Sequence, residues 1–62
     1  MKTFYVIKHD ASWLPRIYGC NVSENPLSFR SIPIEYIEWT EKVRAETEQS
    51  AVIKAKEQRK QK

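Results

Sequence analysis

Three side chains could form a nucleophilic group: His9, Asp10 and Cys20, the only cysteine. His9 and Asp10 are adjacent in a segment with the composition of a turn. A cysteine beside a histidine can act as a nucleophile. The simpler interpretation is a surface histidine in a turn and a half-buried thiol, and we favour it. Since glycine-rich phosphate loops and paired-cysteine motifs are also missing from the sequence, we expect neither an enzyme nor a cofactor.

Glutamates could hold a metal ion if they shared one face of a helix. Glu35, Glu38 and Glu41 follow one another at three-residue steps. No histidine accompanies them, so we interpret them as a solvated helix face. One cysteine and one histidine are too few for a zinc site. We therefore expect no metal.

Basic residues crowd the end of the chain and could contact nucleic acid. They are Lys54, Lys56, Arg59, Lys60 and Lys62. Such a cluster is the electrostatic footprint of a nucleic-acid-binding protein. However, no aromatic residue follows Trp39 to stack on bases. We favour a solvated helix end whose charge complements the helix dipole. Nucleic-acid binding stays the alternative function, and an acidic protein surface is another possible target.

Aromatic residues are more numerous than a small core can bury. The chain has two Trp, three Tyr and two Phe among 62 residues. Exposed Tyr and Trp commonly anchor protein interfaces. The candidate partner-binding residues are Trp13, Tyr18, Trp39 and, on the C-terminal helix, Ile53. The expected partner is another protein or a second copy of the chain.

The first half of the chain has the composition of strands and turns. Residues 2–8 are aromatic and β-branched, and both faces of such a strand would be apolar. Residues 16–22 predict a second strand. Residues 23–26 form the clearest turn, and residues 27–32 are expected to be extended, with a short third strand as one option.

The second half predicts one long helix. No glycine or proline occurs after Pro33, and proline suits the first position of a helix. The residues Tyr36, Ile37, Trp39, Thr40 and Val43 form an apolar stripe at helical spacing. We therefore expect a helix from Pro33 to Lys62, acidic at its start and basic at its end.

The predicted fold class is α+β: a two- or three-stranded antiparallel sheet packed on one long C-terminal α-helix. Residues 1–46 would form a head that includes the first half of the helix, and residues 47–62 a projecting basic helix end. The residues expected to face the sheet–helix core are Phe4, Val6, Ile17, Tyr36, Ile37 and Val43.

The short chain limits the stability that a core can supply. A domain of this size buries only about 60% of the surface that its unfolded chain exposes. Small scaffolds usually need a disulfide, a metal or a partner, and one cysteine cannot form an intrachain disulfide. An oligomer or a bound partner is therefore expected. No apolar stretch approaches the roughly 20 residues of a membrane span, and no signal peptide is expected.

Three segments together resemble known small proteins. FYVIKHD, RIYGCNVSENP and SIPIEYIEWTEKVRAE resemble short phage-encoded proteins, including tail-fibre-assembly-type modules. The resemblance implies a non-catalytic adaptor or inhibitor that acts on a host or phage protein. Because no signal peptide is expected, the expected location is the cytoplasm, in the host if the protein is viral.

Overall fold

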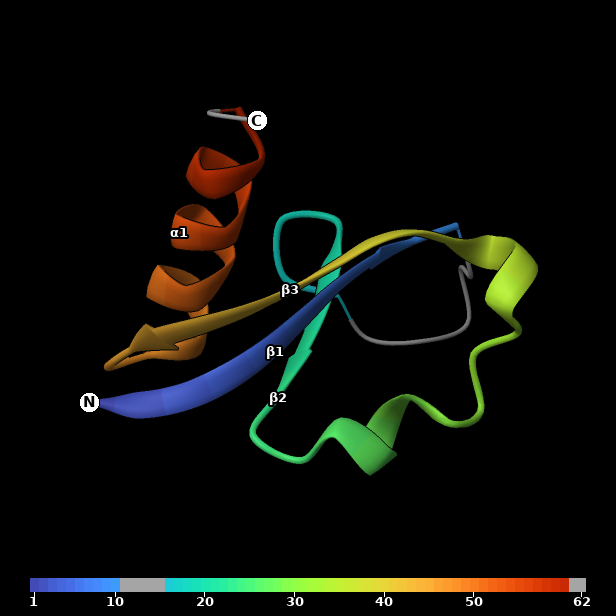
Figure 1. Cartoon of the computed structure of the whole chain (residues 1–62), viewed down its shortest axis with the longest axis horizontal. Helices are drawn as coiled ribbons and strands as arrows, with labels where there is room; N and C mark the ends of the chain where they lie inside the picture. Colours follow the sequence, from blue (N-terminus) through green and yellow to red (C-terminus); the bar gives the residue numbers. More distant parts are fainter. Residues whose placement is uncertain (11–15, 61–62) are drawn as a thin grey trace.

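The computed structural model describes residues 1–10 and 16–60 as a sheet with one helix (Figure 1). The strands are β1 (Lys2–His9), β2 (Cys20–Ser23) and β3 (Ile37–Ala45), and the helix is α1 (Glu48–Lys60). Two single turns of 3-10 helix, η1 (Pro26–Phe29) and η2 (Ile34–Tyr36), lie between β2 and β3. The expected α+β fold class is confirmed, with three strands.

β1 is the central strand of the sheet. The strand order is β2-β1-β3, and both pairings are antiparallel. Val6 lies opposite Val22 of β2 and Glu41 of β3. The register shifts between Lys8 and His9, where β3 contributes one extra residue, which is the geometry of a β-bulge.

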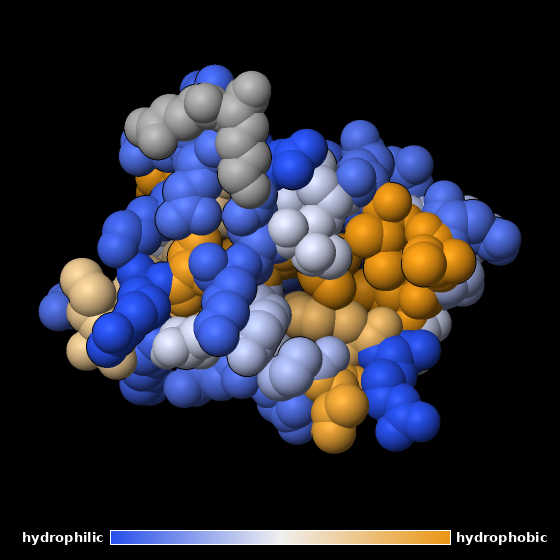
Figure 2. Space-filling view, in the orientation of Figure 1, coloured by the Kyte–Doolittle hydropathy of each residue, from blue (hydrophilic) through white to orange (hydrophobic). Residues whose placement is uncertain are grey.

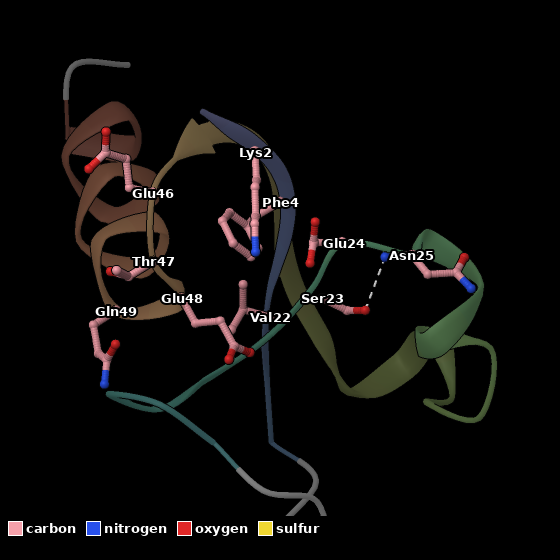
Figure 3. A pocket seen from close by; sticks show the side chains of 10 residues that line it. All are labelled: Lys2, Phe4, Val22, Ser23, Glu24, Asn25, Glu46, Thr47, Glu48 and Gln49. Atoms are coloured by element: carbon pink, nitrogen blue, oxygen red, sulfur yellow. Dashed lines mark hydrogen bonds between the residues drawn. The ribbon is translucent and has the colours of Figure 1, made fainter.

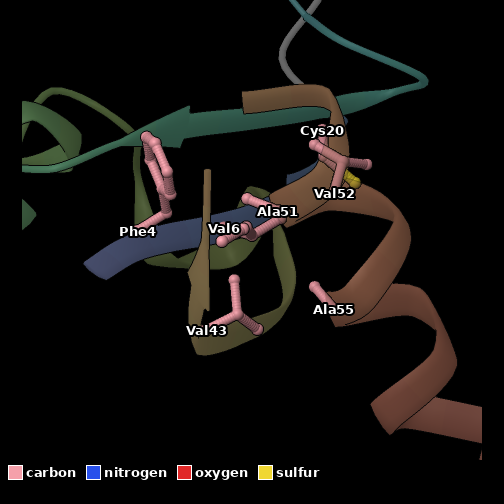
Figure 4. Close-up of a cluster of buried hydrophobic side chains, with 8 residues drawn as sticks. Phe4, Val6, Cys20, Val43, Ala51, Val52 and Ala55 are labelled. Carbon is pink, nitrogen blue, oxygen red and sulfur yellow. The ribbon is translucent and has the colours of Figure 1, made fainter. Parts of the chain in front are cut away.

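The helix covers one face of the sheet. Its contact surface consists of Ala51, Val52 and Ala55, which are fully buried. They pack against Phe4 and Val43 in a cluster that also contains Val6, Cys20 and Ala45 (Figure 4). Because these helix residues are small, the backbone of α1 can lie close to the strands. We call this the helix face.

The segment between β2 and β3 packs on the opposite face. Phe29 and Ile32 bury their side chains against Ile7 of β1, with Tyr5 and Ile37 around them. We call this the η face. The two clusters explain why both sides of β1 are apolar in the sequence: each side of the strand is covered by a different part of the chain.

The expected helix is wrong over its first half, because residues 37–45 form β3. Inward residues of this strand, among them Val43 and Ala45, alternate with exposed ones, among them Lys42 and Arg44. Paired with β1, the segment satisfies one edge of the central strand and buries apolar side chains on the helix face. This tertiary gain overrides the local preference for helix.

The expected projecting helix end is also wrong. The division after residue 46 does coincide with the turn between β3 and α1. Beyond it, however, α1 lies on the sheet, and its buried residues complete the helix-face cluster. The helix has 13 residues and begins at Glu48 instead of Pro33, so the sheet is long enough to support it.

Three of the six residues expected in the sheet–helix core are buried there: Phe4, Val6 and Val43. Ile17 packs against that cluster while partly exposed. Ile37 packs on the η face instead, because the bulge beside it reverses the alternation of side chains. Tyr36 is exposed at the end of η2.

Turns interrupt the other expected strands. Residues 16–22 do not form one strand, because the chain reverses at Tyr18 and Gly19, whose φ angles are 52° and 84°. The flanking Ile17 and Cys20 exchange backbone hydrogen bonds of 2.7 and 2.9 Å. Positive φ at both central residues is the geometry of a type I′ hairpin turn. Residues 27–29 lie in η1 instead of an extended strand.

Candidate functional site

Trp39 lies on the helix face of β3 and is only partly exposed. The guanidinium of Arg59 lies 5.6 Å from the centre of its ring. Arg59 also forms an ion pair with Glu41, with 3.7 Å between Nη1 and Oε1. The indole is therefore covered by the end of α1, and it contributes mainly to the packing of helix on sheet.

The other expected partner-binding residues come from different parts of the chain. Tyr18 is 61% exposed on the type I′ turn. Ile53 is 50% exposed on α1, beside a hollow lined by Met1 and Ala45. Trp13 lies outside the described residues. Tyr18, Trp39 and Ile53 therefore lie on three different elements, namely the turn before β2, β3 and α1.

The basic residues of α1 are largely occupied by contacts within the chain. Lys54 Nζ donates to the carbonyl oxygen of Arg44 at 2.6 Å, and Lys56 Nζ donates to that of Tyr18 at 2.7 Å. Arg59 contacts Trp39 and Glu41 as described above. These contacts distribute the cations over different sides of the helix. Lys60 is exposed, and Lys62 lies outside the described residues. Nucleic-acid binding through this cluster therefore gains no support and stays a prediction.

An apolar surface lies over η1 and η2. Ile34 is 85% exposed and Leu27 is 63% exposed, and Tyr36 is exposed at the end of η2. Figure 2 shows hydrophobic atoms gathered on the side of the molecule where η1 and η2 lie in Figure 1. We call Leu27, Ile34 and Tyr36 the η1–η2 surface.

A groove of about 370 Å³ lies on the same side of the sheet. The residues that line it are Tyr5, Ile7, Pro26, Phe29, Thr40, Glu41 and Lys42. The ammonium of Lys42 lies 6.0 Å from the centre of the Tyr5 ring. The lining of the groove is therefore mainly apolar, with one acidic and one basic residue, Glu41 and Lys42, which suits a side chain of a protein partner.

Sequence reasoning missed Leu27 and Ile34. Leu27 falls in the segment expected to be extended, and Ile34 falls in the segment expected to be helical. In the structure each lies in a 3-10 turn that follows a proline. The apolar residues beside Pro26 and Pro33 could have indicated an exposed apolar surface. A tight turn cannot bury all its side chains on one sheet.

A second, more polar hollow of about 500 Å³ lies between the start of β1, the turn after β2 and the start of α1 (Figure 3). Three glutamates line it, Glu24, Glu46 and Glu48, together with Lys2. No histidine or cysteine is among its lining residues. Across the described ranges, no group of three or more acidic, histidine or cysteine residues is placed to hold a metal ion.

Cys20 and His9 are both buried, and neither is on the surface as a site would require. Cys20 belongs to the helix-face cluster, with its side chain fully enclosed. Burial raises the pKa of its thiol above the ordinary value, and the charges of Lys56 and Lys8 offset only part of that effect. The neutral thiol is a poor nucleophile. His9 is likewise fully buried, at the end of β1, instead of lying in a surface turn.

Comparison with protein-family models, curated proteins and solved structures finds no match to this chain. Within residues 1–10 and 16–60, no helix is long and apolar enough to cross a membrane. The function therefore has to be inferred from the surfaces described above.

Proposed function

We propose that this chain is a non-catalytic protein-binding protein, a phage-type adaptor or inhibitor that acts on a host or phage protein in the cytoplasm. The observation that carries the proposal is the η1–η2 surface. Large apolar side chains that cluster on the surface of a small domain commonly mark an interaction site. The assignment to a phage-type family is proposed from the sequence resemblance alone.

The surface is held in place by the fold. Phe29 and Ile32 turn inward and pack on Ile7, while their neighbours Leu27 and Ile34 turn outward. Asn25 caps η1 by accepting a hydrogen bond from the Leu27 N–H at 3.0 Å. The outward side chains are thus fixed on a buried base, which lowers the entropy lost when a partner binds.

A pair of substitutions tests the proposal. Leu27→Asp and Ile34→Asp would place charges on the η1–η2 surface without altering a buried residue. Affinity capture with the tagged chain from host cells should lose its specific partner when both substitutions are present. Ile53→Asp is the matched control, because Ile53 is also an exposed isoleucine but lies on α1.

Circular dichroism should first show that each variant keeps its fold. If the folded double variant captures the same protein as the unmodified chain, the η1–η2 surface does not bind it. Loss of capture with Ile53→Asp alone would move the binding surface to α1 and overturn the present assignment.

A further inference from the structure

The η face of the sheet is covered only in part. Phe29 packs on Ile7, and Tyr5 lies at the border of that cluster. Further along β1, Thr3 is partly exposed, and its partner on β3, Arg44, is exposed. The half of the η face between the start of β1 and the end of β3 is therefore open to solvent. We call it the open half.

Two cations of β3 lie on the open half. Val43 and Ala45 are buried on the helix face, so Lys42 and Arg44, which alternate with them, point to the η face. Both cations are exposed, and their Cα atoms are about 6.8 Å apart along the strand. The other strand residues on this half are uncharged: Thr3, Tyr5, Ser23 and Thr40.

Glu41 lies beside these cations in the sequence but does not neutralise them. It is opposite Val6, so its side chain points to the helix face. There its carboxylate forms the 3.7 Å ion pair with Arg59, and the side chain is only 9% exposed. The open half therefore carries a net positive charge, which suits an anionic ligand.

An aromatic ring lies among these charges. Tyr5 is opposite Lys42, whose ammonium lies 6.0 Å from the centre of the ring. Tyr5 also lines the groove of about 370 Å³ described above, so part of the ring is accessible to a ligand. Because the ring packs against the cluster of Ile7 and Phe29, its position is fixed before a ligand binds, which favours binding.

A ring beside two cations matches the chemistry of single-stranded nucleic acid. Each nucleotide carries one flat base and one phosphate. Bases stack on aromatic side chains whatever their sequence, while a positively charged surface follows the phosphates. A duplex hides the faces of its bases, and an acidic protein segment supplies anions without a flat ring in every unit. Single strands therefore fit the open half better than either.

We propose that the open half binds single-stranded nucleic acid, with a base stacked on Tyr5 and phosphates held by Lys42 and Arg44. The present contact of Lys42 with the ring is exposed and weak, so the ammonium can exchange it for a phosphate. The open half shares no residue with the η1–η2 surface. Nucleic-acid binding and capture of a protein can therefore succeed or fail independently.

Fluorescence anisotropy of a labelled oligothymidylate tests the proposal on the whole chain. We expect a dissociation constant of about 100 μM at low salt, as for other small sequence-independent contacts. Two phosphate contacts predict that the logarithm of the association constant falls with the logarithm of the salt concentration, with a slope of about −1.4. Oligouridylate should bind similarly, and duplex DNA of the same length should bind more weakly.

Substitutions separate the ring from the charges. Tyr5→Thr should weaken binding about tenfold because it removes the stacking ring, whereas Tyr5→Phe should bind like the unmodified chain. Lys42→Gln and Arg44→Gln should each reduce the salt slope by about 0.7. Lys60→Gln is the matched control, since it removes the same charge from an exposed position on α1 and should leave the slope unchanged.

Four results would contradict the proposal. The first is no binding of oligothymidylate at about 1 mM chain. The second is a Tyr5→Thr variant, folded by circular dichroism, that binds as tightly as Tyr5→Phe. The third is an equal loss of slope in Lys60→Gln and Lys42→Gln, which would place the contact on α1. The fourth is displacement of the oligonucleotide by polyglutamate at equal charge concentration, which would assign the open half to an acidic protein.

Discussion

Cys20 shows how surroundings decide the chemistry of a residue. In sequence it is a possible nucleophile, but in the fold it begins β2 beneath α1 and is fully buried. Desolvation raises the pKa of the thiol, while Lys56 and Lys8 act in the opposite direction. Because desolvation is the larger effect, the neutral thiol is the form that the folded state prefers.

We predict that this preference makes stability depend on pH through Cys20. Below the ordinary thiol pKa of 9.0, the thiol is neutral in both the folded and the unfolded state. The buried thiol of Cys20 then makes its full contribution to the free energy of unfolding. As pH rises from there through the higher folded-state pKa, the unfolded thiol ionises first and the contribution is lost. Urea unfolding of the unmodified chain and of Cys20→Ala, at pH 7 and pH 10, measures the difference between them.

The stability difference between the two proteins should shrink or reverse at the higher pH. An equal difference at both pH values would show that the thiol has the same pKa in both states. The same burial predicts slow alkylation by iodoacetamide in native buffer and fast alkylation in urea.

Arg59 has a structural role that its position in a basic cluster conceals. We predict that Arg59→Ala destabilises the fold by about 0.5–1 kcal/mol, since it removes the cation from the Trp39 ring. The ion pair with Glu41 is partly exposed and adds little more. Urea unfolding followed by far-ultraviolet circular dichroism measures the change. Lys60→Ala removes the same charge one residue away and should have a smaller effect.

At the scale of elements, β3 shows the limit of local sequence patterns. Ile37, Trp39 and Val43 fit a helical stripe, yet Trp39, Glu41, Val43 and Ala45 also alternate strictly. The two periodicities coincide over so few residues that neither excludes the other. Strand is chosen over helix because β1 needs a partner for its second edge. This is a tertiary property, and the sequence of residues 37–45 alone does not reveal it.

The sequence predicted that the chain ends in a helix, but it did not predict where this helix begins. A helix that begins after residue 46 has its own capping residue, Thr47, whose Oγ1 accepts a hydrogen bond from the Ser50 N–H at 3.1 Å. A threonine at this position is a standard start signal, but the absence of glycine and proline upstream obscured it.

We predict that Thr47→Ala lowers the free energy of unfolding by about 1 kcal/mol, because the first turn of α1 loses its side-chain acceptor. Thr47→Ser keeps the hydroxyl and should cost much less. Both can be measured by thermal unfolding. If alanine and serine have equal effects, the cap contributes nothing and α1 is held by its packing alone.

For the whole molecule, α1 is an integral layer instead of an appendage. Ala51, Val52 and Ala55 cover Phe4, Val6 and Val43 on the helix face. Without them the sheet would expose this cluster to water, and a sheet of three strands in so short a chain has little other stability.

We predict that a chain ending at Thr47 does not fold. Its circular dichroism should show no cooperative unfolding transition, because the helix-face cluster is lost. A projecting helix would instead leave a folded head. If residues 1–47 alone give a cooperative transition, the packing of α1 is dispensable.

Removal of the helix would unfold the chain as well as remove its basic residues. Substitutions of single basic residues are therefore a better test of nucleic-acid binding.

The sequence predicted the layers of the molecule better than its surfaces. Fold class, the first strand and three of the core residues follow from hydrophobic pattern and composition. The η1–η2 surface does not, because exposure of Leu27 and Ile34 depends on how two prolines direct the chain around Phe29 and Ile32. Tyr18 and Ile53 are exposed as an interface would need, but the fold places them on different elements.

The antiparallel pairing of Lys2 with Ala45 has a consequence for the newly made chain. β1 is synthesised first, yet its partner β3 is complete only when most of the chain exists. At 5–20 residues per second, residues 10–45 take roughly two to seven seconds to add after β1 is complete. Throughout that interval the helix face of β1 has no cover, because α1 follows β3 in the chain. Expression of this protein should therefore be sensitive to the rate of translation and to chaperones that hold extended apolar segments.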